Sequence, residues 1–297
     1  MSHKLTLISA PAGFGKTALV GEWLQQGGYP TAWVSLHECD NDPVSFWRYV
    51  ITALKTLHAD VGETALALLR SPRLQPIEAI LTLLINTLTA IPHDFALVLD
   101  DYQVLDTQSI HDSITFLLNH LPPHMHLVIA SRSDPPFPLA RLRAQGELTE
   151  LRTADLCFLF DEVRTFFTQK RRLDLSEEVL CALEVRTEGW ITGLQLAALA
   201  LQAHEDREHL MTAFSGSHRY VVDYLTEEVL YQQSQHVQTF LLYTSILDRL
   251  SALLCDAVSG QNSSQAMLEQ LERAICSSFH SIASDAGIAI TTCAGYP

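Results

Sequence analysis

The chain has 297 residues, of which 47% are hydrophobic, with a formal net charge of −15 and a pI near 5.2. This apolar content excludes a disordered protein, and the length is sufficient for two or three units with their own cores. The acidic balance argues against direct DNA binding by this segment, because contacts to phosphates need clustered lysine and arginine.

Strands and helices alternate through the first half of the chain. Four apolar runs bounded by turn residues predict buried strands, and apolar residues at helical spacing lie between them. The predicted strands are residues 5–8, 31–36, 95–99 and 126–130, and the predicted helices are residues 18–26, 42–57, 77–89 and 110–121. Continuous apolar strands that alternate with helices indicate an α/β fold, with a parallel sheet covered on both faces.

After about Leu151 the pattern changes to helices alone. The predicted helices are residues 160–170, 176–189, 191–203, 220–232 and 237–247. Their leucine stripes indicate the core of a helical region. The Gly-Trp-Ile run at 189–191 is assigned to this core and not to a functional site. The longest apolar stretch, residues 190–203, is too short to span a bilayer, and the N-terminal apolar run is too short for a signal peptide.

The six cysteines form no Cys-x-x-Cys pair, and the histidines near them lack zinc-ligand spacing. Such cysteines are typical of free thiols in a reducing compartment. We therefore expect a cytoplasmic protein that makes no contact with a membrane.

A glycine-rich loop joins the first predicted strand to the first predicted helix, and residues 9–17 read Ser-Ala-Pro-Ala-Gly-Phe-Gly-Lys-Thr. A strand, a glycine-rich loop and a helix in this order are typical of a binding site for nucleotide phosphates. The glycines let successive backbone N–H groups point into one concavity, and the N-terminus of the helix adds the positive end of its dipole. Lys16 would contact the β- and γ-phosphates, and Thr17 would bind Mg²⁺. The predicted nucleotide-binding residues are Ala12, Gly13, Phe14, Gly15, Lys16, Thr17 and Ala18. Ala10 stands where the consensus has its first glycine, and the alternative is a βα turn with an incidental lysine.

Two further strand ends carry charged residues. Asp100 and Asp101 follow the third predicted strand, so their carboxylates are expected at the carboxyl edge of the sheet beside the phosphate loop. Asp100 is the predicted Mg²⁺ ligand, and Asp101 is predicted to orient and polarise the attacking water. Arg132 follows the fourth predicted strand and can contact the γ-phosphate. Arg141 and Arg143 compete for this sensor role.

Several motifs of this sequence, taken in their order along the chain, resemble those of a known protein family. The phosphate loop and the Asp-Asp strand end are followed in order by Ala-Ser-Arg-Ser-Asp-Pro-Pro at 130–136, Leu-Ala-Arg-Leu-Arg at 139–143, Glu-Gly-Trp at 188–190 and Thr-Ser-Ile-Leu-Asp-Arg-Leu at 244–250. This set resembles the ATPase module of MalT-like transcriptional regulators of the LuxR type, which are signal-transduction ATPases with numerous domains. Ala10 is the form that this family uses. The resemblance covers residues 3 to 274.

The resemblance implies a P-loop nucleotide-binding domain at 1–152, a helical lid at 153–215 and a winged-helix-like region at 216–274. It also implies ATP, ADP and Mg²⁺ as cofactors, a closed ADP state, an open self-associating ATP state and slow hydrolysis that resets the switch. We expect the sensor and the DNA-binding domain of such regulators to be missing from this chain. A P-loop metabolic kinase or ATPase, and an inert truncated product, are the alternatives.

Residues 275–297 differ from the rest of the chain. They are rich in serine, threonine and small residues and follow no helical or strand period. An alternative reading frame of plausible codons gives a family-like continuation after Ala274. We therefore expect the tail to be a frameshift product, with an ordinary divergent tail as the alternative, and the nucleotide sequence distinguishes the two.

Overall fold

The computed structural model describes residues 3–71, 75–203, 222–224, 226–231, 233–247, 250–260 and 264–275. The chain divides into two compact units. One comprises Met1–Ala10 and Lys16–Arg152, and the other comprises Pro11–Gly15 and Thr153–Pro297. The tip of the phosphate loop is therefore grouped with the second unit. The predicted helix at 220–232 lies partly, and the predicted frameshift tail almost wholly, outside the described residues.

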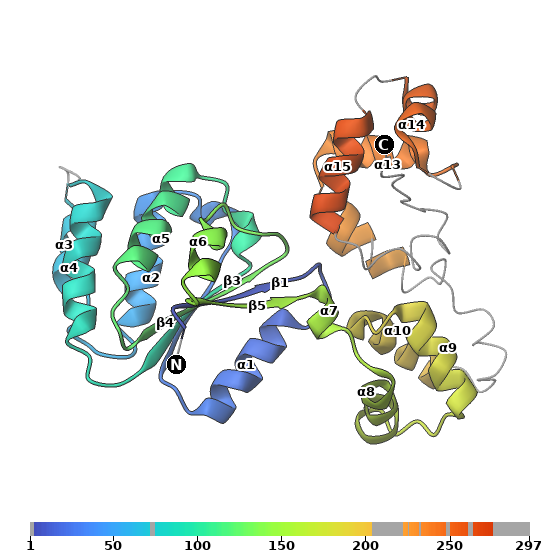
Figure 1. The fold of residues 1–297 in the computed structure, drawn as a ribbon, viewed down its shortest axis with the longest axis horizontal. Coiled ribbons are helices and arrows are strands. Elements are labelled where there is room, and N and C mark those ends of the chain that lie inside the picture. Colours follow the sequence, from blue (N-terminus) through green and yellow to red (C-terminus); the bar gives the residue numbers. More distant parts are fainter. Residues whose placement is uncertain are drawn as a thin grey trace. The chain divides into compact units, whose positions relative to one another are not determined.

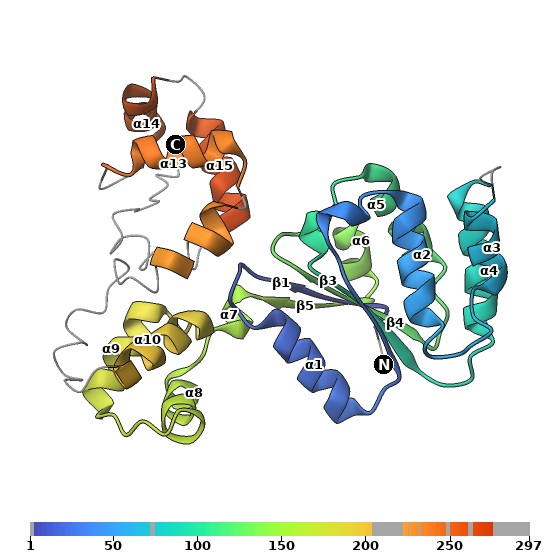
Figure 2. The same cartoon turned by 180° about the vertical axis from the view of Figure 1, so that it is seen from behind.

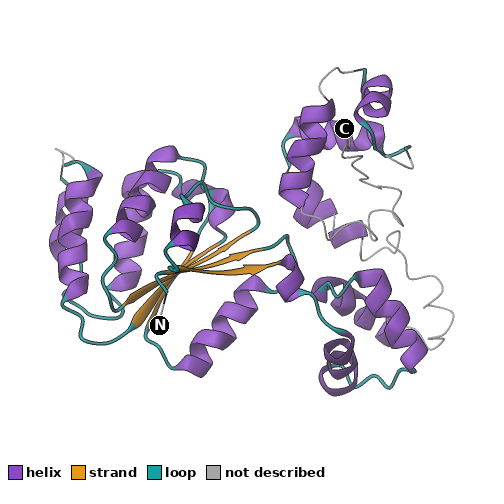
Figure 3. Cartoon of the chain, viewed as in Figure 1, coloured by secondary structure: helices purple, strands orange, loops and turns teal. Residues whose placement is uncertain are grey.

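A five-stranded sheet forms the centre of the first unit (Figures 1 and 3). Its strands are β1 Leu5–Ser9, β2 Thr31–Ser35, β3 Phe95–Asp100, β4 Met125–Ser131 and β5 Leu148–Arg152, in the order β2-β3-β4-β1-β5. All pairs are parallel. The predicted α/β class with a parallel sheet is thus confirmed. The sequence prediction missed β5, because this edge strand is partly exposed along its length and reads as a polar segment.

Helices cover both faces of this sheet. They are α1 Lys16–Gly27, α2 Pro43–Leu54, α3 Glu63–Leu69, α4 Ile77–Thr89, α5 Gln108–Asn119 and α6 Leu139–Ala144. α1 lies on one face, and α2, α5 and α6 lie on the other (Figures 1 and 2). Local signals place their ends: Asp42 accepts a hydrogen bond from the Ser45 N–H at 2.8 Å and Pro43 begins α2.

The main core lies between the sheet and the larger group of helices. Alternate strand residues such as Leu5, Leu7, Leu97 and Leu127 point into it, and each of these is fully buried. The Trp47 indole N–H also donates to the Ser113 hydroxyl at 2.9 Å and so links α2 with α5. This packing fixes the strands in register, which in turn fixes where their carboxyl ends lie.

The second unit is helical in its described parts. It contains α7 Thr153–Leu156, α8 Phe160–Thr165, α9 Glu177–Thr187, α10 Ile191–Ala203, α13 Gln235–Thr244, α14 Ala252–Ser259 and α15 Ser264–Ile275. π-helical turns occupy Phe166–Lys170 and Thr226–Leu230. Helices α13, α14 and α15 share a small core around Phe240, Cys255 and Leu271. None of the described helices has both the length and the apolar composition needed to cross a membrane.

Candidate functional site

The site is built where three neighbouring strands end. β1 lies beside β4, with Ser9 opposite Ser131, and β3 lies on the other side of β4. Because the strands are parallel, their carboxyl ends meet at one edge of the sheet. The residues that follow β1, β3 and β4 are the phosphate loop, Asp101 and Arg132, which are those that the sequence singled out.

Lys16 begins α1 with its side chain turned back into the loop. It is 8% exposed, and its ammonium donates to the Ala10 carbonyl oxygen at 2.7 Å. Burial, helped by the Arg132 charge, lowers the pKa of Lys16 to about 8, and the charges of Asp101 and Asp100 oppose this shift. The structure therefore brings Lys16, Asp100, Asp101 and Arg132 close enough to act on one another. Of the three candidate arginines, Arg132 is the one whose charge acts on Lys16.

Thr17 and Asp100 form the predicted metal pair. Asp100 is the last residue of β3, is 3% exposed and accepts a hydrogen bond from the Thr17 side chain. Burial raises the pKa of Asp100, the Asp101 charge adds to this, and the Thr17 hydrogen bond and Lys16 oppose it. A hydroxyl that touches a carboxylate at the start of a helix is a hard-oxygen donor pair suited to Mg²⁺.

Asp101 lies in the left-handed region, with φ of 57°, and so turns the chain sharply after the strand. Its N–H donates to Asp100 Oδ1 at 3.0 Å. The Gln103 side chain connects it to the next strand end: Gln103 Nε2 donates to Asp101 Oδ1 at 3.0 Å, and the Arg132 N–H donates to Gln103 Oε1 at 2.9 Å. The sequence prediction missed Gln103, and only its position two residues after Asp101 signals its role.

The tip of the phosphate loop belongs to the second unit and contacts α10 there. The Trp190 indole N–H donates to the Ala12 carbonyl at 3.2 Å, and the Thr192 hydroxyl donates to the Gly13 carbonyl at 2.9 Å. Gly13 has φ of +78°, and a Cβ placed on it would lie 2.7 Å from the Trp190 Nε1 atom. Only glycine fits this position.

Trp190 and Thr192 are thus loop-contacting residues that the sequence prediction assigned to helix core or passed over. Trp190 is indeed buried, and its ring centroid also lies 5.5 Å from that of Tyr224. A buried indole still needs an acceptor for its N–H, and this requirement was the available signal. Among the remaining predicted binding residues, Gly15 has φ of +74°, Phe14 is buried and Ala18 is exposed on α1.

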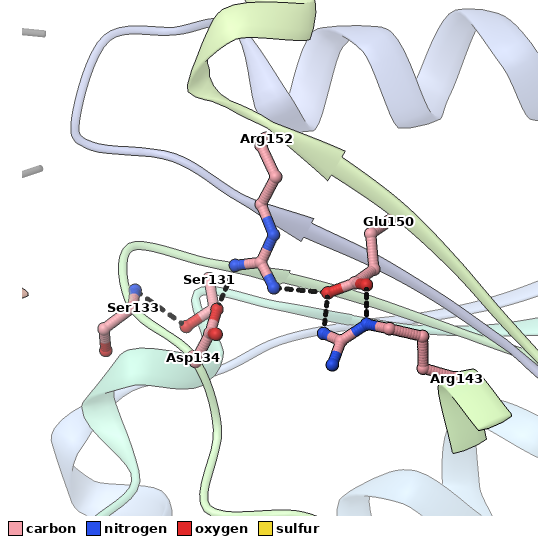
Figure 4. Close-up of polar contacts among 6 residues, drawn as sticks. All are labelled: Ser131, Ser133, Asp134, Arg143, Glu150 and Arg152. Atoms are coloured by element: carbon pink, nitrogen blue, oxygen red, sulfur yellow. Dashed lines mark hydrogen bonds and ion pairs between the residues drawn. The ribbon is translucent and has the colours of Figure 1, made fainter. Parts of the chain in front are cut away.

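A second group of charged residues links β5 to α6 and to the segment after β4 (Figure 4). We call it the β5 ion network. Arg143 on α6 holds Glu150 of β5 with two hydrogen bonds, at 2.7 and 2.8 Å, and Arg152 pairs with both Glu150 and Asp134. Ser133 donates its N–H to the Ser131 hydroxyl in the segment that carries Asp134. Arg143 is therefore engaged by Glu150.

The first unit alone offers a cation, a hydroxyl–carboxylate pair, a second carboxylate and an arginine at one sheet edge. This donor set fits a phosphate chain with one Mg²⁺ ion, for which most ligands come from phosphates and water. Within the described residues, no group of three or more His, Cys, Asp or Glu side chains is arranged to hold a metal ion.

Comparison with known proteins relates the chain to bacterial regulators. Residues 226–276 match the MalT winged helix domain. The HTH-type transcriptional regulator MalT of Serratia proteamaculans is 32% identical over 274 residues, and that of Yersinia enterocolitica is 31% identical over 276. Each alignment covers 92% of this chain and 30% of the relative, so the chain spans about a third of the relatives' length. The predicted resemblance to MalT-like regulators is confirmed.

Solved structures show more distant likeness. The Orc1 protein of Aeropyrum pernix in complex with DNA has 12% identity and a TM-score of 0.47, over 91% of this chain and 77% of that one. AMPPCP-bound DnaA from Aquifex aeolicus has 13% identity and a TM-score of 0.39, over 95% and 80%.

Proposed function

We propose, from the relationship to MalT-type regulators over 92% of the chain, that this protein is the nucleotide-binding ATPase module of a transcriptional regulator. One observation carries the proposal. The charges of Arg132, Asp101 and Asp100 act on Lys16, and the Thr17 side chain donates a hydrogen bond to Asp100. A cation, a metal pair and a second carboxylate at the end of adjacent parallel strands form the arrangement that phosphoryl chemistry requires.

Each residue then has a role. The loop residues Ala12 to Ala18 hold the phosphates of ATP or ADP, and the Lys16 ammonium leaves the Ala10 carbonyl to contact the β- and γ-phosphates. Thr17 and Asp100 would hold Mg²⁺, which would neutralise charge on the phosphates. Asp101 orients a water molecule and takes its proton as the oxygen attacks the γ-phosphorus and the bond to the bridging oxygen breaks. Arg132 contacts the γ-phosphate.

These roles make a switch. ATP and ADP differ by the γ-phosphate, so only a group that contacts it distinguishes the two states. We propose that Arg132 is this group, that slow hydrolysis returns the protein to its ADP state and that self-association accompanies the ATP state. Direct DNA binding is not assigned to this acidic segment. Because its relatives regulate transcription, we place the module in the cytoplasm.

Equilibrium binding of a fluorescent ATP analogue tests the proposal. We expect micromolar or weaker binding that Lys16→Ala weakens by roughly 100-fold, since removing a buried charge partner costs about 2–5 kcal/mol. Lys4→Ala is the matched control, because Lys4 makes a half-buried ion pair with Glu147 directly before β1. Equal binding by wild type and Lys16→Ala would overturn the site assignment. Phosphoryl transfer to an added metabolite would favour a kinase instead.

A further inference from the structure

Gln103 joins the two strand ends at which the proposed base and the proposed sensor lie. It is half-buried in the short 3-10 turn Tyr102–Val104, directly after Asp101. Its side chain makes two hydrogen bonds of normal length, one to the Asp101 carboxylate at 3.0 Å and one from the Arg132 backbone at 2.9 Å.

Chemistry fixes the direction of both bonds. The Arg132 backbone nitrogen has a hydrogen to donate and no lone pair to offer, so the atom that faces it must be the Gln103 oxygen. The amide nitrogen then faces Asp101, and an amide nitrogen only donates. Asp101 Oδ1 therefore acts as the acceptor. One rigid amide plane thus connects the Arg132 backbone to the Asp101 carboxylate.

The backbone makes Asp101 sensitive to this restraint. With φ of 57° it lies in a region that L-residues rarely adopt. Its backbone is held by its own N–H bond to Asp100 and by the Val104 N–H bond to its carbonyl. The Asp101 side chain is thus oriented by Gln103 while its main chain is already fixed.

We propose that Gln103 is a positioning residue that couples the Arg132 segment to the Asp101 carboxylate. This inference rests on the proposed function. Contact of the Arg132 side chain with a γ-phosphate would turn the Gln103 amide, and the amide would then set the orientation of the Asp101 carboxylate toward the attacking water. Hydrolysis is then possible only when the sensor is engaged.

Two variants separate the two hydrogen bonds. Gln103→Met keeps the length of the side chain and removes both. Gln103→Glu keeps the acceptor for the Arg132 N–H and removes the donor to Asp101. Gln108→Met is the matched control, since Gln108 on α5 also donates to a carboxylate, that of Asp112, at 2.9 Å on an exposed helix face.

We expect both Gln103 variants to lower kcat for ATP hydrolysis about tenfold, as the loss of a hydrogen bond to a charged group predicts, while KM stays within about twofold. Gln108→Met should leave both constants unchanged. A merely structural Gln103 would instead give wild-type kcat in the Glu variant, and that result would overturn the proposal.

A measurement without nucleotide keeps the test independent of the proposed function. The Asp101→Asn substitution should shift the amide NMR resonance of Arg132 in the wild-type background and leave it unmoved in the Gln103→Met background. Amide hydrogen exchange at Arg132 should accelerate in Gln103→Met and not in Gln103→Glu. If Asp101→Asn moves the Arg132 resonance equally in both backgrounds, Gln103 does not couple them. If coupling is present but ATP does not bind, the proposed function fails and the coupling stands.

Discussion

Two groups of charged residues lie on one sheet, and their pKa values are perturbed for opposite reasons. In the group around the phosphate loop, burial is the first cause: it lowers the pKa of Lys16 to about 8 and raises that of Asp100. In the β5 ion network, partners are the first cause: the Arg143 hydrogen bond, with help from Arg152, lowers the pKa of Glu150 to about 2.

The difference shows which group is prepared for a ligand. In the buried group both shifts disfavour the charged forms, so the charges there cost free energy until phosphates and a cation arrive. In the β5 ion network, the pKa shifts of Arg143, Glu150 and Arg152 all favour the charged forms. These charges already pair with one another. Between these two groups, desolvation perturbs the pKa values beside the phosphate loop, and ion pairs perturb those of the β5 ion network.

The largest expected effect comes from Asp100→Asn. We expect it to remove the Mg²⁺-dependent part of ATP affinity, by about 100-fold, because a metal contact contributes several kcal/mol. The nucleotide-free protein should melt no earlier than wild type, since burial disfavours the ionised carboxylate that the variant removes. Titrations of ATP with and without Mg²⁺, together with thermal melts, give both values.

Asp94→Asn is the matched control for Asp100→Asn, because Asp94 directly precedes β3 and pairs with His124 at 3.0 Å. It should leave the effect of Mg²⁺ unchanged. If Asp100→Asn destabilises the protein but leaves Mg²⁺-ATP binding normal, then Asp100 has a structural role. The two groups of charged residues would then not differ in the way described above.

The second effect is a pH dependence of binding. With its pKa lowered to about 8, Lys16 loses its proton above that pH in the free protein, and phosphates restore the charged form. Binding therefore takes up a proton, and ATP affinity should fall by up to about tenfold per pH unit above pH 8. The phosphates of ATP are already ionised in this range and add no slope of their own.

Lys16→Arg provides the control for this pH dependence, since a guanidinium stays charged throughout the range. Its affinity, whatever its absolute value, should be flat from pH 8 to 10. Calorimetry in buffers of different ionisation enthalpy should also detect uptake of about half a proton by the wild type at pH 8. Flat wild-type affinity across this range would mean that Lys16 does not contact the phosphates.

Sequence reasoning reached the sheet and most of the first group, because strong local signals encode both. The apolar runs at 5–8 and 95–99 are continuous, and the phosphate loop and the two aspartates follow them. It missed β5, whose partly exposed residues lack that signal, and with β5 it missed the ion network. Gln103 and Trp190 were missed for another reason: their roles depend on hydrogen bonds to residues on other elements, and no local pattern records such contacts.

The β5 ion network should show a smaller effect on stability. Glu150→Gln removes a carboxylate whose pKa is lowered to about 2, so its contribution to folding stability is complete above the unfolded value of about 4.5 and is lost as pH falls toward 2. We expect a loss of about 1 kcal/mol at pH 7 that vanishes near pH 2, because water screens a pair this close to the surface. Urea unfolding at several pH values measures it, and a loss that persists unchanged at pH 2 would contradict an electrostatic origin.

The smallest expected effect is that of Arg143→Ala, about 0.5 kcal/mol at low salt. The Arg143 side chain is 55% exposed, so added salt screens its bond to Glu150, and the difference from wild type should shrink in 1 M NaCl. Arg141→Ala on the same helix removes an arginine of the same size outside this network and serves as the control. A salt-independent loss at Arg143 would mean that its stem packs against β5, and the network would then resemble the buried group more than its exposure suggests.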